Sequence, residues 1–347
     1  MATTAVPASA GPVPTGARVS SFPLGWYDAI RRPERLSQFG QEGIDLAVPY
    51  NRDGVDPTSY LDSALVSGVG VMLMIDRALA AKPDLARVRS YVARFKSHPA
   101  LSGWHLADEP TIYRERISPE NARKVYRTIR SVDPDHPVAI VFGVSEDARP
   151  FIGAMDIMML DDFVCVAKRP EFSTLPLWWK HLTDRAAIGR RVGGFIPVIQ
   201  GFGGPFLGKR LPTPAETRYM AFASIVAGAT GIVYWTRYRA RSEWVRSVLS
   251  PVLTELRQLR PAFERQAIPG VRVAAPSVTA SLFREPGDGS LILIAVHHGS
   301  GNVVAGLSVR SAALGGRAFE MRNGQARPAD LEKDVFGPYE VRVYRLA

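Results

Sequence analysis

Short apolar runs recur along the chain, separated by polar segments whose apolar residues have helical spacing. The runs end at Gly, Pro and Asp and are rich in Val, Ile, Leu and Met with little alternation, as in strands buried on both faces. They predict eight strands, at residues 22–28, 43–51, 69–76, 101–109, 137–144, 156–163, 194–202 and 231–238. Because each is followed by a helical pattern, the strands must pair in parallel with right-handed crossovers. We therefore expect an α/β fold, a closed (β/α)8 TIM barrel over residues 21–267.

Helix signals follow several of these strands. Residues 84–95 have apolar side chains at helical spacing, and Ser118 and Thr213 each precede a proline, as an N-cap residue does. After the last helix of the barrel, expected at 242–266, the pattern changes to an alternation of period two at residues 281–283, 291–296, 318–321 and 339–344. Residues 268–347 therefore predict a small antiparallel β-sandwich domain that packs on the flank of the barrel.

Composition narrows the class of protein. Apolar residues make up 46% of the 347 residues, but none of their runs approaches the roughly 18 residues that span a bilayer, so we expect no membrane insertion. The single cysteine, Cys165, excludes a disulfide framework, and the six histidines lack metal-binding spacing, so no metal or other cofactor is expected. Residues 1–20 predict a flexible lead-in or the remnant of a secretion signal, which slightly favours a secreted or periplasmic protein.

The strand at residues 101–109 ends on two carboxylates and a proline, Asp108, Glu109 and Pro110. Proline cannot continue the ladder, so both acids lie at the carboxyl end of the strand, which is the catalytic face of a parallel barrel. Other strands bring more carboxylates, amides and rings to this face: Tyr27, Asp28, Asn51, Asp76, Asp161, Gln200, Trp235 and Arg237. Sugar rings lie on aromatic side chains, and their hydroxyls need fixed polar partners. These residues therefore predict a cleft for a carbohydrate.

The segment HPALSGWHLADEP, residues 98–110, resembles the fourth-strand signature of (β/α)8 glycoside hydrolases related to the large retaining clan, in the branch that reads Asp-Glu-Pro. Residues 156–163, 213–238 and 336–346 resemble the sixth strand, the seventh helix with the eighth strand, and the closing strand of the β-domain in that group. The resemblance implies hydrolysis of O-glycosidic bonds in a polysaccharide or oligosaccharide. It also implies that Glu109 is the general acid/base and that Trp235 lies under the bound sugar.

One position departs from the clan, whose nucleophile is a Glu at the end of strand seven. Gln200 stands in the corresponding stretch, and a neutral amide cannot attack an anomeric carbon as a carboxylate would. We expect Asp161 to be the second carboxylate, because it ends strand six and matches an Asp of the resembling group, with Asp28 and Asp76 in reserve. A separation of roughly 5–5.5 Å from Glu109 would favour retention of configuration, and roughly 6.5–9.5 Å would favour inversion. The missing nucleophile favours inversion or a non-standard retaining arrangement.

Two orientations stay open at this point. Strict strand alternation with Glu109 inward puts Ala107 inward too and turns Asp108 toward the helices, unless a bulge at the strand end turns Asp108 inward. Gln200 either contacts a sugar hydroxyl or ties down the Gly-rich loop at residues 201–205.

The net charge of +10 has a solvated, Arg-rich surface as its simplest explanation. The sequence lacks a basic stripe with interleaved aromatic residues, so no nucleic-acid partner is expected. Cations nevertheless follow strands six to eight, at Lys168, Arg169, Lys209, Arg210, Arg237, Arg239 and Arg241. If several converge on the cleft, they favour an acidic glycan. The sequence thus predicts a glycosidase, with a non-catalytic glycan-binding barrel and a transglycosylase as the alternatives.

Overall fold

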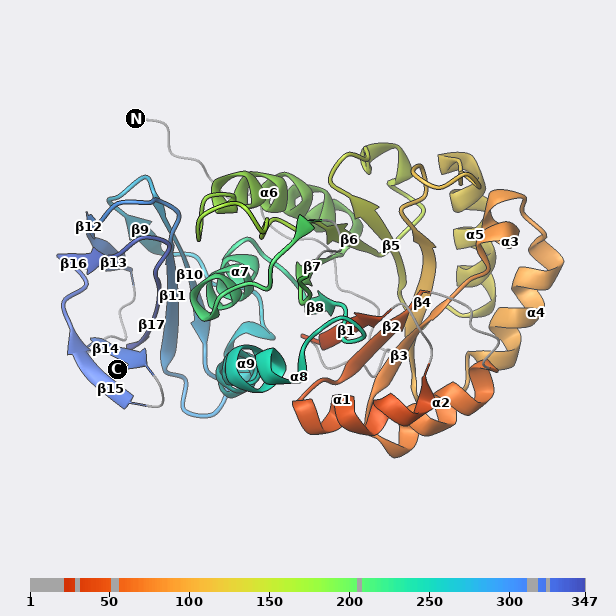
Figure 1. The fold of residues 1–347 in the computed structure, drawn as a ribbon, viewed down its shortest axis with the longest axis horizontal. Coiled ribbons are helices and arrows are strands. Elements are labelled where there is room, and N and C mark those ends of the chain that lie inside the picture. Colours follow the sequence, from red (N-terminus) through yellow and green to blue (C-terminus); the bar gives the residue numbers. More distant parts are fainter. Residues whose placement is uncertain are drawn as a thin grey trace.

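Eight parallel strands close into a barrel in the computed structural model, which describes residues 22–28, 32–50, 56–204, 208–310, 318–322 and 325–346. The strands are β1 (Leu24–Asp28), β2 (Leu46–Pro49), β3 (Gly70–Met74), β4 (Leu101–Asp108), β5 (Val138–Gly143), β6 (Ile157–Asp161), β7 (Gly194–Gln200) and β8 (Ile232–Trp235). They pair in sequence order, and β1 also pairs with β8, which closes the ring (Figure 1). Each strand lies within its predicted range, so the predicted barrel is confirmed. The lead-in expected at residues 1–20 lies outside the described residues.

Helices cover the outside of the barrel: α1 (Leu36–Glu42), α2 (Pro57–Val66), α3 (Arg77–Ala81), α4 (Leu85–Phe95), α5 (Pro119–Val132), α6 (Leu175–Val192), α7 (Pro214–Val226), α8 (Ser242–Trp244) and α9 (Ser250–Phe263). The predicted caps are confirmed, because the Ser118 hydroxyl accepts the Asn121 amide at 3.1 Å and Thr213 forms a reciprocal capping box with Glu216. None of the described helices is long and apolar enough to cross a bilayer.

The connection from β5 to β6 differs from the strand-helix pattern. Residues 144–156, all of them described, form only a 3-10 turn at Arg149–Phe151. Gly153, with a φ of +86°, then takes the left-handed conformation that ends it. In the parallel pairing of these strands, Gly143 at the end of β5 is the register partner of Asp161 at the end of β6.

Two apolar layers lie on the two faces of the barrel strands. Side chains that point inward form a small core inside the barrel, which includes Val48, Val141, Met159, Val198 and Val233. Side chains that point outward form a larger core under the helices, to which the fully buried Trp104 belongs. Burial on both faces explains why the strands are continuous apolar runs in the sequence.

Strand β4 contains the irregularity that shapes the site. Its register against β5 shifts between His105 and Ala107, as in a β-bulge. Leu106 and Ala107 both belong to the outer core, so the expectation that Ala107 points inward is wrong. The extra residue changes the alternation, and Asp108 bonds to Tyr27 of the inner core. Asp108 therefore points into the barrel.

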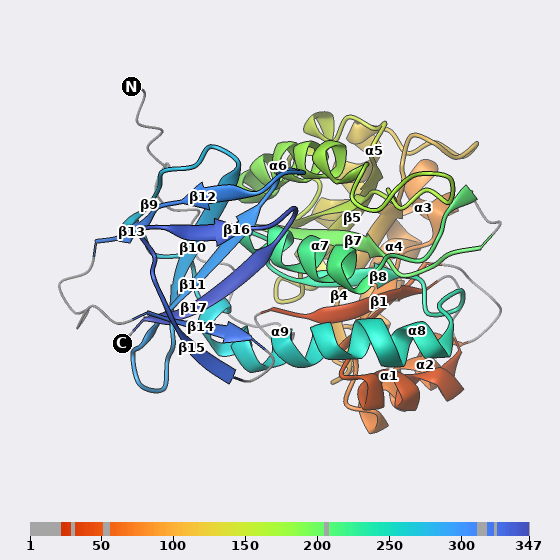
Figure 2. The same cartoon turned by 60° about the vertical axis from the view of Figure 1, so that its left-hand side comes forward.

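The C-terminal part forms antiparallel sheets, as predicted (Figures 1 and 2). One sheet has the strand order β10 (Val278–Arg284), β11 (Leu291–His297), β17 (Val341–Leu346), β14 (Ala318–Arg322) and β15 (Gln325–Ala329). Two ribbons pair β12 (Val303–Ala305) with β16 (Asp334–Phe336) and β13 (Leu307–Val309) with β9 (Val271–Val273). The face of the large sheet that carries Ile292, Ile294 and Val343 packs near α7 and α9 and extends the outer core of the barrel. The β-domain therefore lies on the flank of the barrel.

Candidate active site

Glu109 follows β4 in a turn that bends its carboxyl over the neighbouring strand. Its φ of +44° is in the left-handed region, which a non-glycine residue keeps only where surrounding contacts hold it. The Glu109 amide donates to the Val141 carbonyl of β5 at 2.9 Å. The carboxyl lies directly against Gly143, because a Cβ on Gly143 would be 2.6 Å from Oε1 of Glu109. A residue without a side chain is what leaves room for the carboxyl at the end of β5.

Asp161 ends the next strand. Asp161 and Gly143 are register partners in the pairing of β5 with β6, and neighbouring strands are about 4.8 Å apart. Asp161 alternates with Met159, which points into the barrel, whereas the adjacent Asp162 bonds outward to α6 at 2.8 Å. The Glu109 side chain therefore reaches across β5 toward Asp161.

The Glu109 carboxyl is harder to ionise than a carboxyl in water. Burial and the negative charges on Asp108 and Glu146 raise the pKa of Glu109 to about 7, and Tyr113 and Arg77 oppose this only in part. A carboxylic acid with such a pKa keeps its proton in mildly acidic solution, as a general acid must.

Asp161 is also shifted toward its protonated form. Burial raises the pKa of Asp161 well above its ordinary value, and the charges on Asp108 and Glu109 add to the effect. Among the described residues, its Oδ1 atom is buried without a hydrogen-bond partner. Buried polar atoms are usually paired, so an unpaired one at a cluster of acids marks a site for a ligand or a reacting group.

Asp108 is engaged on both oxygens. Its Oδ1 accepts a bond from the Tyr27 hydroxyl, and its Oδ2 accepts one from the Tyr113 hydroxyl at 3.3 Å. Burial raises the pKa of Asp108 to about 6, although both hydroxyls favour the ionised form. Asp108 therefore lies close to Glu109 and Asp161, and its two oxygens orient the hydroxyls of Tyr27 and Tyr113.

Aromatic rings at the ends of β2, β6 and β8 contact one another at the same end of the barrel. Trp235 stacks on Phe163 with ring centroids 5.0 Å apart, meets the edge of Phe202, and donates its Nε1 hydrogen to the Tyr50 hydroxyl at 2.8 Å. We call Phe163, Trp235 and Tyr50 the aromatic wall. Tyr27 is 1% exposed and stacks beneath Tyr50, so it supports this wall and does not offer its own face to a sugar.

Three predicted sugar contacts are used by the protein itself. Asp28 accepts a bond from the Thr236 hydroxyl at 2.5 Å, and Arg237, 7% exposed, forms an ion pair with Glu42 of α1 at 2.9 Å. Asp76 is partly exposed and caps α3 by accepting a backbone amide at 2.9 Å. Asp28 and Arg237 are therefore buried and bonded within the protein, to Thr236 after β8 and to Glu42 of α1, and their role as sugar contacts stays a prediction. Asn51 lies outside the described residues.

Gln200 is another predicted contact whose polar atoms bond within the protein. It is fully buried, its Oε1 accepts the Cys165 amide at 2.9 Å, and its Nε2 donates to the carbonyls of Arg210 and Phe202 at 2.7 and 3.0 Å. The carbonyls and amide belong to the loops that follow β6 and β7. The loop-fixing alternative for Gln200 is therefore the one that the structure supports.

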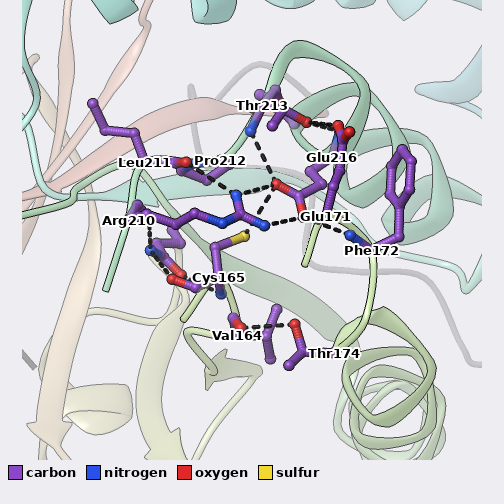
Figure 3. Close-up of polar contacts among 12 residues, drawn as sticks. Val164, Cys165, Glu171, Phe172, Thr174, Arg210, Leu211, Pro212, Thr213 and Glu216 are labelled. Atoms are coloured by element: carbon purple, nitrogen blue, oxygen red, sulfur yellow. Dashed lines mark hydrogen bonds and ion pairs between the residues drawn. The ribbon is translucent and has the colours of Figure 1, made fainter. Parts of the chain in front are cut away.

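A partly buried ion pair links the loop after β7 to α7 (Figure 3), and its glutamate also bonds to the loop after β6. The Arg210 guanidinium points at the Glu216 carboxylate and binds it through two nitrogens, at 2.6 and 2.7 Å. Glu216 also accepts the backbone amides of Phe172 and Thr213 at 2.9 and 3.0 Å, and Cys165 Sγ lies 3.7 Å from it. We call Arg210 and Glu216 the loop anchor.

Two charged residues near Glu109 were not singled out from the sequence. Arg77, the first residue of α3, donates to the carbonyls of Asp108, Glu109 and Pro110 at 2.6, 3.3 and 3.3 Å. Glu146 accepts the amides of Thr111 and Gly143 at 2.7 and 2.8 Å. Each follows a predicted strand on the catalytic face by one or two residues, and that position is the feature of the sequence that could have identified them.

Among the described residues, no group of three His, Cys, Asp or Glu side chains is arranged to hold a metal ion.

The fold resembles solved glycoside hydrolases. A family 5 enzyme from Bacteroides vulgatus shares 13% identity over 94% of this chain and 88% of its own, with a TM-score of 0.63. A family 27 β-L-arabinopyranosidase from Geobacillus stearothermophilus shares 12% identity over 94% of this chain and 96% of its own, with a TM-score of 0.59. A family 39 enzyme from Bacteroides cellulosilyticus shares 10% identity over 94% of this chain and 82% of its own, with a TM-score of 0.56. No protein-family model and no curated protein matches the sequence. These likenesses confirm the barrel with its C-terminal β-domain.

Proposed function

We propose that this protein is a glycoside hydrolase in which Glu109 is the general acid and Asp161 is the second carboxylate. The observation that carries the proposal is the Glu109 carboxyl, which lies over Gly143 toward Asp161. Glycosidases need two carboxyl groups across the scissile bond, one protonated and one ionised. The likeness to glycoside hydrolases of several families supports the same activity.

In the proposed reaction Glu109 gives its proton to the glycosidic oxygen, which leaves with the bonding electron pair. In one route Asp161 bonds to the anomeric carbon, and a water that gives its proton to Glu109 then displaces it. In the other, Asp161 takes a proton from the water that attacks the anomeric carbon directly. A proton on Glu109 removes one of the negative charges that raise the pKa of Asp161, so the protonated acid favours the ionised base. Asp161 is preferred over Asp108 for this role, because both Asp108 oxygens are bonded to tyrosines.

The aromatic wall would take the face of the sugar. An acidic glycan is the finer part of the proposal, and fewer cations support it than the sequence offered. Arg210 and Arg237 are paired with glutamates, and the Lys209 ammonium donates to the Phe163 carbonyl at 2.5 Å. The remaining cations are exposed and would be the groups that meet an acidic substrate: Lys168, Arg169, Arg239 and Arg241.

The test is hydrolysis of a panel of α- and β-linked oligosaccharides, neutral and uronate-bearing, by the wild type and by Glu109→Gln and Asp161→Asn. We expect sugar release by the wild type and its loss in both variants. A wild type that binds a glycan without releasing sugar would be a glycan-binding barrel, and longer oligosaccharide products would make it a transglycosylase. Full activity of Glu109→Gln would refute the assigned acid.

A further inference from the structure

Two side chains of opposite charge hold the turn that carries Glu109. Arg77 comes from α3, on one side of β4, and its guanidinium gathers three consecutive carbonyls, those of residues 108–110. Glu146 comes from the loop after β5, on the other side, and its carboxylate accepts both the amide and the hydroxyl of Thr111. The residues next to Glu109 in the chain are thus held by hydrogen bonds from the segments that follow β3 and β5, the two strands beside β4.

We propose that Arg77 and Glu146 are opposed positioning residues, which hold the Glu109 carboxyl over Gly143 and place charges of opposite sign beside it. The proposal rests on the proposed role of Glu109 as the acid.

The backbone conformation requires such a hold. A φ of +44° is unfavourable for a glutamate, and such a conformation persists when surrounding contacts fix it. Glu146 also accepts the Gly143 amide, so one carboxylate fixes both the turn after β4 and the glycine that the Glu109 carboxyl lies against. Loss of either tie would let the close approach of Glu109 to Gly143 relax.

The two charges act on Glu109 because each lacks a salt-bridge partner among the described residues. The Arg77 guanidinium bonds to carbonyls and lies 4.6 Å from the centroid of the Tyr113 ring. The Glu146 carboxylate bonds to amides and a hydroxyl. Hydrogen bonds of this kind leave the net charge in place, and in a partly dry site that charge shifts a neighbouring acid.

The ionisable groups that face Glu109 come from four segments: Asp108 and Tyr113 around the end of β4, Arg77 on α3, Glu146 after β5, and Asp161 on β6. Within this set Glu146 raises the pKa of Glu109 and Arg77 lowers it. Removing the two charges singly must therefore move the pKa of Glu109 in opposite directions. A loss of structure alone would give no such opposition of sign.

The experiment measures kcat/KM against pH for Glu146→Gln and Arg77→Gln. In Glu146→Gln the acid loses its proton more easily, so the alkaline limb moves down by roughly half a pH unit; in Arg77→Gln it moves up by roughly as much. The lost hold on the turn should also lower kcat in Arg77→Gln. Arg77→Lys, which keeps the charge but not the fork of donors, should return the limb to its wild-type position but leave kcat below that of the wild type. Glu332→Gln and Arg327→Gln, exposed in the β-domain, make the same charge changes and should move nothing.

Direct titration of the Glu109 carboxyl carbon by NMR, assigned by its loss in Glu109→Gln, gives the same two signs without any substrate. Opposite shifts in this titration support the inference even if no glycan is cleaved, so failure of the proposed function remains distinguishable. Shifts of the same sign, or none, in variants that unfold cooperatively would overturn it. The pKa of Glu109 should fall in Glu146→Gln and rise in Arg77→Gln. If one variant does not fold, the direction of the shift in the other still tests the inference.

Discussion

Two glutamates at the same end of the barrel, the buried Glu216 and the half-buried Glu109, have opposite pKa shifts. Burial opposes ionisation of Glu216, but two bonds from Arg210 and two backbone amides outweigh it, so its pKa lies below the ordinary value. Burial also opposes ionisation of Glu109, and there the neighbouring charges of Asp108 and Glu146 add to it, so its pKa rises to about 7. Burial alone therefore does not distinguish a reactive acid from an anchoring one. The sign of the surrounding charge does.

The comparison predicts its largest effect at Glu109. Glu109→Gln keeps the shape of the side chain but removes the proton that the leaving oxygen needs, so kcat/KM should fall at least about 100-fold. Because the wild-type carboxyl is unfavourably placed for its charge, thermal stability near neutral pH should stay the same or rise. Activity assays and thermal unfolding of the same preparation check both parts. A variant that loses activity and stability together would show that Glu109 stabilises the fold, as Glu216 does in the loop anchor.

The same substitution at Glu216 should reverse the outcome. Glu216→Gln leaves the Arg210 guanidinium, 24% exposed, without its counter-charge, and losing charged hydrogen bonds of this kind costs about 2 kcal/mol of unfolding free energy. Urea unfolding measures this cost, and well below the midpoint kcat/KM should fall far less than in Glu109→Gln. The matched control is Glu255→Gln, whose pair with Arg218 is partly exposed and should cost less than about 1 kcal/mol. Equal costs for the two variants would show that the Glu216 pair is no stronger than a surface pair.

The barrel was predictable because its strands carry a strong one-dimensional signal. Each is buried on both faces, so each is an apolar run, and Pro110 fixes where the fourth strand stops and hence where Glu109 stands. The direction of Asp108 was not predictable in the same way. A single bulged residue between His105 and Ala107 reverses the alternation, and the sequence contains no separate mark of it.

The polar residues were harder to assign because their partners come from distant parts of the chain. Gln200 and Arg237 stand at strand ends like true ligands, but the loop at Cys165 and the helix at Glu42 use their bonding capacity. Arg77 and Glu146 bond mainly to backbone atoms, which every residue has. The residue types of their partners therefore do not indicate these bonds, and the sequence did not single out Arg77 and Glu146.

Stability against pH separates the two regions by sign. A carboxyl with a raised pKa, such as Asp161, weakens the folded state as the pH rises from its unfolded pKa through its folded one; Glu216, with a lowered pKa, contributes stability that is lost as the pH falls. Relative to the wild type, Asp161→Asn should therefore gain stability at about pH 8 and little at about pH 4. Glu216→Gln should lose most at neutral pH and least in acid. Urea midpoints at several pH values test this, and parallel curves for both variants would contradict it.

The smallest effect is expected from the exposed cations at the rim. Arg241 is exposed, unlike Arg237, which is buried in its pair with Glu42. Screening over about 10 Å at 0.1 M salt leaves an exposed charge with little influence beyond direct contact, so Arg241→Glu should raise KM for a uronate-bearing glycan only about two- to threefold. KM for the neutral analogue should not change, and Arg327→Glu in the β-domain should change neither. Added salt should reproduce the effect in the wild type, since it weakens the same attraction. An equal KM for both glycans in every variant and at every salt concentration would remove the acidic substrate while leaving the roles of Glu109 and Asp161 untouched.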